Sequence, residues 1–192
     1  MPKIICLNGP PQSGKDTTAL IIAEYLTTKG EVCLIDKFAH PLDAIAKVTL
    51  GFNDDLYRVY REELKDAPLP GYPDRTMRQV LIAISEDYIK PLFGDDFFAI
   101  QAVNRIQNSS FADWIVFSDS GFQLEFDKLK ELLQTEKDSW VRLMRLERGD
   151  GFNFDKDSRE YVNDTSFVSV DNTKDIKHLK KIVHSRIDSF LN

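Results

Sequence analysis

Five short runs of mostly apolar residues divide the chain, and longer stretches in which apolar residues recur at helical spacing lie between them. The runs occupy residues 3–7, 32–35, 114–117, 140–146 and 167–170. A strand that is apolar throughout is typical of a parallel sheet covered by helices on both faces. Strands that alternate with helices therefore predict an α/β fold of three layers, α/β/α, around a parallel sheet of roughly five strands.

The helical stretches predict the two covering layers and the extent of the domain. They occupy residues 14–29, 41–51, 77–88, 98–106, 122–133 and 173–190, with Asn172 or Thr173 as the candidate cap of the last helix. The absence of a repeat, a low-complexity segment or a linker predicts a single domain over residues 1–192. Within it, the polar, proline-rich residues 53–75 predict a substrate-binding excursion, and residues 147–163 predict a lid loop.

A glycine-rich turn joins the first predicted strand to the first predicted helix. Residues 9–15 (GPPQSGK) fit Gly-x-x-x-x-Gly-Lys in the strand-to-helix context of a P-loop, and so predict a P-loop NTPase fold. Backbone N–H groups, the helix N-terminus and a lysine ammonium together bind β- and γ-phosphates. The predicted ATP-binding residues are Gly9, Gln12, Ser13, Gly14, Lys15, Asp16 and Thr17. The alternative is a glycine-rich turn with a solvated lysine.

The residue after the lysine departs from the strict motif. A serine or threonine that binds magnesium is usual there, but this chain has Asp16, and Thr17 comes one position later. A carboxylate is a competent ligand of Mg²⁺, so Asp16 and Thr17 are the predicted metal residues. The alternative is that Asp16 only complements the positive end of the helix.

Acidic residues at strand ends and arginines near the lid are the candidate catalytic groups. Asp36 and Asp119 follow the second and third predicted strands, and ligands collect beyond the carboxyl ends of parallel strands. Asp119 is equally suited to cap the next helix. Phosphoryl transfer needs cations around the transferred group, which an arginine-bearing loop can supply. The predicted catalytic set is Lys15, Asp119, Arg145, Arg148 and Arg159, although a solvated surface role is open for each single arginine.

Basic and aromatic residues around the proline-rich segment could grip a phosphate and stack on a base. Arg61 and Arg78 lie there, with Phe38, Tyr57 and Tyr60. The alternative is an exposed charged helix face, which is the favoured interpretation for Arg58 and Lys65.

Composition excludes several classes of partner. With 25 Lys and Arg against 31 Asp and Glu, the net charge is −6, which disfavours polymeric nucleic acid but leaves small nucleotides as ligands. No run approaches the roughly 20 apolar residues of a membrane span, and we expect no membrane partner. We therefore expect a cytoplasmic protein with reduced core thiols at Cys6 and Cys33. A homodimer stays open.

The motifs together resemble one family. Residues 9–17 (GPPQSGKDT), with aspartate after the lysine, resemble the phosphate loop of bacteriophage deoxynucleoside monophosphate kinases and, more distantly, of phosphomevalonate kinase. Residues 38–42 (FAHPL), Arg78 followed by residues 84–87 (ISED), and residues 145–161 (RLERGDGFNFDKDSREY) match in the same order. The chain departs from several relatives in having Gly121 and Phe122 where those have an arginine soon after the third strand.

The resemblance implies a nucleoside monophosphate kinase fold, ATP·Mg²⁺ as donor and a deoxynucleoside monophosphate as acceptor. It implies that residues 38–42 and Arg78 line the acceptor pocket and that Arg145, Arg148 and Arg159 belong to the closing lid. With the strand-end acids and the basic residues described above, the predicted substrate-binding residues are Asp36, Phe38, His40, Arg61, Arg78 and Asp119. If a phage encodes the protein, as the resemblance implies, we expect it in the host cytoplasm.

The leading hypothesis is ATP-dependent phosphoryl transfer to a (deoxy)nucleoside monophosphate. One alternative is a kinase of another small phosphorylated metabolite. The other is a nucleotide-dependent switch or binding module, which the absence of Asn-Lys-x-Asp and Asp-x-x-Gly motifs disfavours.

Overall fold

The computed structural model describes residues 1–134, 140–154 and 159–191, and the chain separates into two compact units. The first unit combines Met1–Phe38 with Ala99–Asn192, and the second is the inserted segment Ala39–Phe98. The predicted excursion at 53–75 is therefore part of a larger insertion, which also contains the helices predicted at 41–51 and 77–88.

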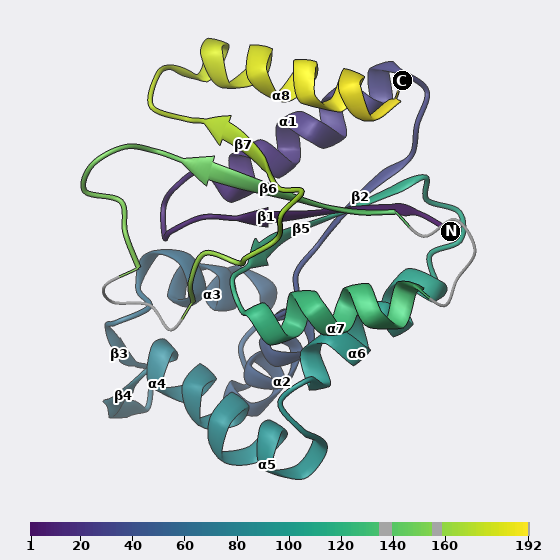
Figure 1. Cartoon of the computed structure of the whole chain (residues 1–192). Coiled ribbons are helices and arrows are strands. Elements are labelled where there is room, and N and C mark those ends of the chain that lie inside the picture. Colours follow the sequence, from purple (N-terminus) through teal and green to yellow (C-terminus); the bar gives the residue numbers. More distant parts are fainter. Residues whose placement is uncertain (135–139, 155–158, 192) are drawn as a thin grey trace. The chain divides into compact units, whose positions relative to one another are not determined.

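The first unit is built on a parallel sheet of five strands, as predicted (Figure 1). The strands are β1 (Lys3–Asn8), β2 (Cys33–Asp36), β5 (Trp114–Ser120), β6 (Val141–Glu147) and β7 (Val168–Asp171). Their order is β2-β5-β1-β6-β7, and every neighbouring pair is parallel. Strands β5 and β2 thus lie on one side of the central strand β1, and β6 and β7 lie on the other, so the strand order reverses at β1. In such sheets, ligands bind beyond the carboxyl ends of the strands at this point.

Strand β5 is longer than the sequence predicts. Its apolar run ends at Phe117, but the strand continues through Ser118, Asp119 and Ser120, and Asn8 of β1 pairs with Ser120. Both serines are about 2% exposed. The expected end at residue 117 is therefore wrong, because polar residues continue the strand inside the protein.

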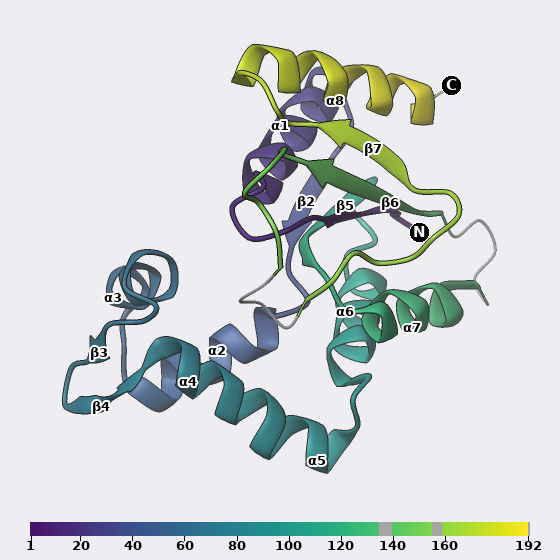
Figure 2. The same ribbon diagram turned by 60° about the vertical axis from the view of Figure 1, so that its left-hand side comes forward.

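Helices cover both faces of this sheet. In Figures 1 and 2, α1 (Lys15–Thr28) and α8 (Ile176–Leu191) lie on one face, and α7 (Gln123–Gln134) lies on the other with α6 (Phe97–Gln107). Leu7, Ile22 and Val183 are fully buried in the core between the sheet, α1 and α8. The predicted cap of the last helix is wrong: the carboxylate of Asp175 accepts the hydrogen bond from the backbone N–H of His178, at 2.8 Å.

The second unit is mainly helical and has a small core of its own. It comprises α2 (His40–Leu50), α3 (Asp54–Arg58), the π-helix η1 (Val59–Glu63), the hairpin β3 (Pro68–Leu69) and β4 (Tyr72–Thr76), α4 (Met77–Ile82), the π-helix η2 (Ala83–Ile89) and α5 (Lys90–Phe93). Ala46, Tyr57, Leu69, Met77 and Leu81 form the core. Gly51, with φ of 66°, ends α2 as the sequence predicts.

The helix predicted at 77–88 runs further than expected. It continues without a break from α4 through η2 into α5, past Pro91, and ends at Gly94, which has φ of 96°. Pro91 lies in the first turn of α5 and lacks an N–H group, so it cannot donate a helical hydrogen bond. The π-helix η2, which has a wider hydrogen-bond spacing than an α-helix, directly precedes this turn.

Two general expectations can be compared with the structure. Over the described residues, no helix is both long enough and apolar enough to cross a bilayer. Cys6 and Cys33 are both free thiols, as predicted, and burial raises the pKa of Cys33 to about 12.

Candidate functional site

The turn between β1 and α1 has the backbone geometry of a phosphate loop. Gly14 precedes α1 with φ of 94°, a conformation that a side chain would strain. At Gly9, an added Cβ would lie 2.7 Å from Ser13 Oγ and 3.0 Å from the Leu146 carbonyl oxygen. Both glycines of the motif are therefore required by the fold of the loop itself.

The lysine of the motif lies inside the loop. Lys15 is only 8% exposed, and its Nζ donates to the carbonyl oxygens of Gly9 at 2.7 Å and Pro10 at 2.8 Å. The ammonium group is thus held where loop atoms converge, instead of being solvated at the surface. Carbonyl oxygens are weaker partners for a cation than phosphate oxygens, so an anion in the loop can take their place.

Two buried hydroxyl groups lie close to the lysine in the sequence. Among the residues that the structure describes, Ser13 Oγ and Thr18 Oγ1 are buried side-chain atoms with no hydrogen-bond partner in the protein. A buried polar atom normally has a partner, from the protein, water or a ligand. The Ser13 hydroxyl, in the loop itself, is suited to donate to a phosphate oxygen.

Two side chains from neighbouring strand ends hold the loop from outside. Arg148, just after β6, donates from Nη1 to the carbonyl oxygen of Gln12 at 2.7 Å. Asn172, just after β7, donates from Nδ2 to the carbonyl oxygen of Ser13 at 2.7 Å. A Cβ at Gly14 would lie 2.5 Å from this Asn172 nitrogen. Arg148 is a predicted catalytic residue, whereas sequence reasoning missed Asn172, whose position after an apolar run is also typical of a helix cap.

The aspartate that departs from the motif is exposed and partnered. Asp16 Oδ1 accepts a hydrogen bond of 2.8 Å from the hydroxyl of Ser118 and lies 3.4 Å from Lys37 Nζ. Thr17, the other predicted metal residue, is also exposed. No group of three or more His, Cys, Asp or Glu in the described part of the chain could hold a metal ion by itself. A metal here would depend on one carboxylate and on oxygen atoms from bound phosphates, as Mg²⁺ often does.

The predicted acidic residues lie at the carboxyl ends of neighbouring strands. Asp36 ends β2 and accepts a hydrogen bond of 2.7 Å from Arg105 Nε. Asp119, in β5, accepts one of 2.8 Å from the backbone N–H of Phe38. The ring of Phe38 is 2% exposed and packs on Phe117 with 4.7 Å between centroids, so this side chain is part of the core.

Three predicted substrate-binding residues belong to the second unit. His40 is exposed at the start of α2. Arg61 Nε donates to Asp43 Oδ1 at 2.7 Å. Arg78 forms a two-point pair with Asp66, with distances of 2.6 and 2.9 Å. The Arg78 guanidinium lowers the pKa of the Asp66 carboxyl.

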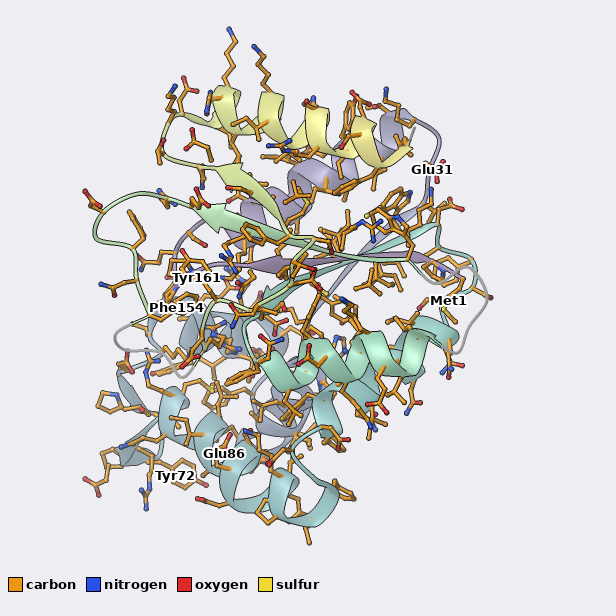
Figure 3. The ribbon with its side chains drawn as sticks, in the orientation of Figure 1. Met1, Glu31, Tyr72, Glu86, Phe154 and Tyr161 are labelled. Carbon is orange, nitrogen blue, oxygen red and sulfur yellow. The ribbon has the colours of Figure 1, made fainter. Side chains whose placement is uncertain are left out.

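The predicted lid loop is anchored over part of its length. Arg145 donates from Nη2 to the carbonyl oxygen of Val162 at 2.8 Å, and its guanidinium lies over the rings of Tyr161 and Phe167. Tyr161 also packs edge-on against Phe154, with 5.0 Å between ring centroids (Figure 3). The side chain of Arg159, the third predicted lid arginine, lies against Gly121.

One comparison, that with solved structures, bears on this fold. No family model and no curated protein matches the chain. A gluconokinase structure from Sinorhizobium meliloti matches 99% of this chain and 95% of its own, with 16% identity and a TM-score of 0.50. A structure from Chloroflexus aurantiacus, assigned only provisionally as a kinase, matches 98% of this chain and 97% of its own, with 14% identity and a TM-score of 0.47. The five-stranded parallel sheet and the first of these matches show that the chain has the α/β fold of P-loop kinases.

Proposed function

We propose that this chain catalyses ATP-dependent phosphoryl transfer to a (deoxy)nucleoside monophosphate and so produces the diphosphate. The observation that carries the proposal is the loop between β1 and α1, in which Gly14 adopts φ of 94° and the buried Lys15 ammonium bridges two loop carbonyl oxygens. A buried cation inside a ring of backbone groups at a helix N-terminus is suited to the β- and γ-phosphates of ATP.

The loop residues would bind the donor. The N-terminus of α1 and the loop N–H groups would face the phosphates, and Lys15 would exchange the carbonyl oxygens of Gly9 and Pro10 for phosphate oxygens. Arg148 and Asn172 keep the loop shaped by holding its carbonyl oxygens from outside. Much of the rate enhancement would come from such positioning and from charge neutralisation, without a covalent enzyme intermediate.

Asp16 fits a role in holding magnesium. Its carboxylate is exposed in the first turn of α1 and is oriented by Ser118. An oriented carboxylate is a suitable hard ligand, directly or through water, and Thr17 can contribute a hydroxyl group. Magnesium, when bound with ATP, neutralises charge on the β- and γ-phosphate oxygens. Lys37, at 3.4 Å from Asp16, offsets part of the negative charge that the aspartate brings to the loop.

Several other predicted residues would act on the acceptor. Asp119, near the carboxyl end of β5, would accept a hydrogen bond from a hydroxyl group of the acceptor, and Arg159, which lies against Gly121, would contact a phosphate. The resemblance to deoxynucleoside monophosphate kinases supports His40 and Arg78 as residues that bind the acceptor, and a nucleotide as its chemical class. Arg61 is proposed because it belongs to the basic and aromatic residues around the proline-rich segment.

A sugar acid is the second candidate acceptor. The structural match to a gluconokinase favours it, because that enzyme is named for a small hydroxyl-bearing acid and covers nearly the whole of this chain. Another phosphorylated metabolite, such as phosphomevalonate, is the alternative that the loop sequence supports.

A coupled ADP-release assay tests these proposals. ATP and Mg²⁺ would be supplied with each of the four dNMPs, their ribonucleotide counterparts, gluconate and phosphomevalonate. We expect turnover with at least one nucleoside monophosphate, which Lys15→Met abolishes while Lys177→Met, an exposed lysine of α8, leaves it unchanged. Turnover only with gluconate or phosphomevalonate would show that the acceptor is not a nucleotide. ATP binding without acceptor-dependent turnover would refute the proposal that the chain is a kinase.

A further inference from the structure

Asn8, the last residue of β1, holds the end of the predicted lid loop through both the nitrogen and the oxygen of its side-chain amide. Asn8 is fully buried, and its Nδ2 donates to the carbonyl oxygens of Ser120 at 3.0 Å and Glu160 at 2.9 Å. Its Oδ1 accepts from the backbone N–H of Val162 at 3.0 Å. Asn8 directly precedes the phosphate loop, so residues 160–162 are attached next to the start of that loop.

Further contacts fix the same segment to the neighbouring elements. Arg145 binds the carbonyl oxygen of Val162, so both backbone groups of that buried residue are held by side chains of central strands. At the start of α7, the side chain of Gln123 binds both backbone groups of Asn163, at 2.7 and 3.2 Å. Residues 160–163 are therefore a fixed part of the first unit, although the sequence predicts a polar lid there.

Arg159 begins this anchored segment, and its side chain runs across a glycine. The backbone N–H of Glu160 donates to the Gly121 carbonyl oxygen at 2.8 Å. An added Cβ at Gly121 would lie 2.6 to 2.7 Å from Cβ, Cγ and Cδ of Arg159, which is too close for any real contact. Gly121 does not have a positive φ, so its backbone would accept alanine. Position 121 therefore requires a glycine because any side chain there would collide with Arg159, and not because of its backbone conformation.

We infer that Asn8 and Gly121 are positioning residues that set the place of Arg159 at the carboxyl ends of β1 and β5, where Arg159 contacts a phosphate group of the bound nucleotides. The inference rests on the proposed kinase function. It also accounts for the sequence Asp119-Ser120-Gly121-Phe122, which has no arginine at the end of the strand. Because Gly121 has no side chain, the side chain of Arg159 can occupy the space beside it.

A double-mutant cycle between Gly121→Ala and Arg159→Gly tests the inference. Arg159→Gly is expected to lower kcat by about 10³-fold, as for other arginines that stabilise a transferred phosphoryl group. Gly121→Ala is expected to lower kcat by about 10- to 100-fold, the effect of misplacing a catalytic group by an ångström, with KM for ATP unchanged. In the Arg159→Gly background, Gly121→Ala is expected to have no further effect, because the clash and the arginine are both gone.

The outcomes separate the possible failures. If the wild-type chain shows no acceptor-dependent turnover, the proposed function fails, whatever the variants do. If it turns over but Gly121→Ala lowers kcat equally in both backgrounds, the glycine acts on the fold and the inference is overturned. Should Gly121→Ala not fold, Gln123→Ala serves in the same cycle: it changes an exposed residue and removes the contacts to Asn163 together with one to Asp127 on α7. Its effect on kcat should likewise disappear without Arg159, and an equal effect in both backgrounds would refute the inference.

Discussion

The hydroxyl of Ser118 in β5 donates a hydrogen bond of 2.8 Å to the carboxylate of Asp16 in the first turn of α1. Ser118 is buried and Asp16 is exposed, so the strand fixes the orientation of a carboxylate that faces solvent at the phosphate loop. This is the group that takes the place of the usual serine or threonine of the motif.

If Asp16 holds magnesium, its removal changes the metal dependence of turnover. Asp16→Ala is expected to raise the Mg²⁺ concentration for half-maximal rate by at least about 10-fold, and Ser118→Ala by a smaller factor, because partners of a metal ligand also affect affinity. The measurement is initial rate against Mg²⁺ at saturating ATP. Asp127→Ala, which removes an exposed carboxylate of α7, is the matched control. An unchanged Mg²⁺ dependence would remove Asp16 from the metal site.

The contact between Asn172 and Ser13 should support ATP binding. Asn172→Ala removes one side-chain donor from the loop carbonyl oxygen, a loss of about 0.5 to 1.5 kcal/mol, which corresponds to a rise of roughly 2- to 10-fold in KM for ATP. Asn108→Ala, on the exposed surface after α6, should leave KM unchanged. A normal KM in Asn172→Ala would show that the loop keeps its shape without this donor.

Gly14→Ala should be more damaging than Asn172→Ala. It places a side chain at φ of 94°, a strain of about 1 to 2 kcal/mol, and brings a Cβ to 2.5 Å from Asn172 Nδ2. We expect both a lower midpoint of thermal unfolding and weaker ATP binding by calorimetry. Adding Asn172→Ala should recover part of the ATP affinity but none of the stability lost to strain. If the double variant instead binds ATP more weakly than Gly14→Ala by the factor that Asn172→Ala costs alone, Asn172 does not crowd position 14.

In the second unit, Asp43 should keep Arg61 in place for the acceptor. Its Oδ1 accepts from the hydroxyl of Tyr57 at 2.8 Å and from Arg61 Nε at 2.7 Å. Asp43→Ala removes this shared acceptor, so we expect a loss of about 1 to 3 kcal/mol in urea unfolding and a higher KM for the acceptor nucleotide. Asp54→Ala, an exposed carboxylate paired with Lys47, is the control. A stability loss without any change in KM would mean that Arg61 does not bind the acceptor.

The sequence predicts the sheet and the phosphate loop because both depend on local patterns. Runs such as residues 114–117 are apolar enough to be buried from either side, and the loop requires Gly9 and Gly14 for its own backbone. The hairpin of β3 and β4 was not predictable in this way. Residues Tyr72 to Arg75 of β4 are exposed, so no alternation of apolar and polar residues marks the strand.

The contacts that shape the candidate site depend on residues distant in sequence. In the sequence, Asn8 and Asn172 are simply asparagines beside turns. Only the fold shows that Asn8 binds residues 160 and 162 and that Asn172 binds a carbonyl oxygen of the phosphate loop. Arg145 is similar: an arginine near a polar loop suggests phosphate binding, whereas the structure gives it the carbonyl oxygen of Val162 and two aromatic rings. Polar side chains carry no periodic signal of their partners, so only the tertiary structure identifies them.

Acid should release the anchored end of the lid from α7. Asp164 has a side chain that is 7% exposed; burial alone would raise the pKa of its carboxyl, but hydrogen bonds from Lys130 and Ser166 outweigh burial and lower that pKa to about 2. A folded-state pKa below the unfolded value of 3.8 means that the contribution to stability is complete above about pH 5 and is lost as the pH falls from about 4 to 2. Asp164→Asn should therefore destabilise the protein by roughly 1 to 2 kcal/mol at pH 6 and by progressively less below pH 4. Urea unfolding of both proteins across this range gives the difference, and Lys130→Met in both backgrounds should flatten its pH dependence. A difference that stays constant from pH 6 to pH 2 would show that the charge of Asp164 does not hold this end of the loop.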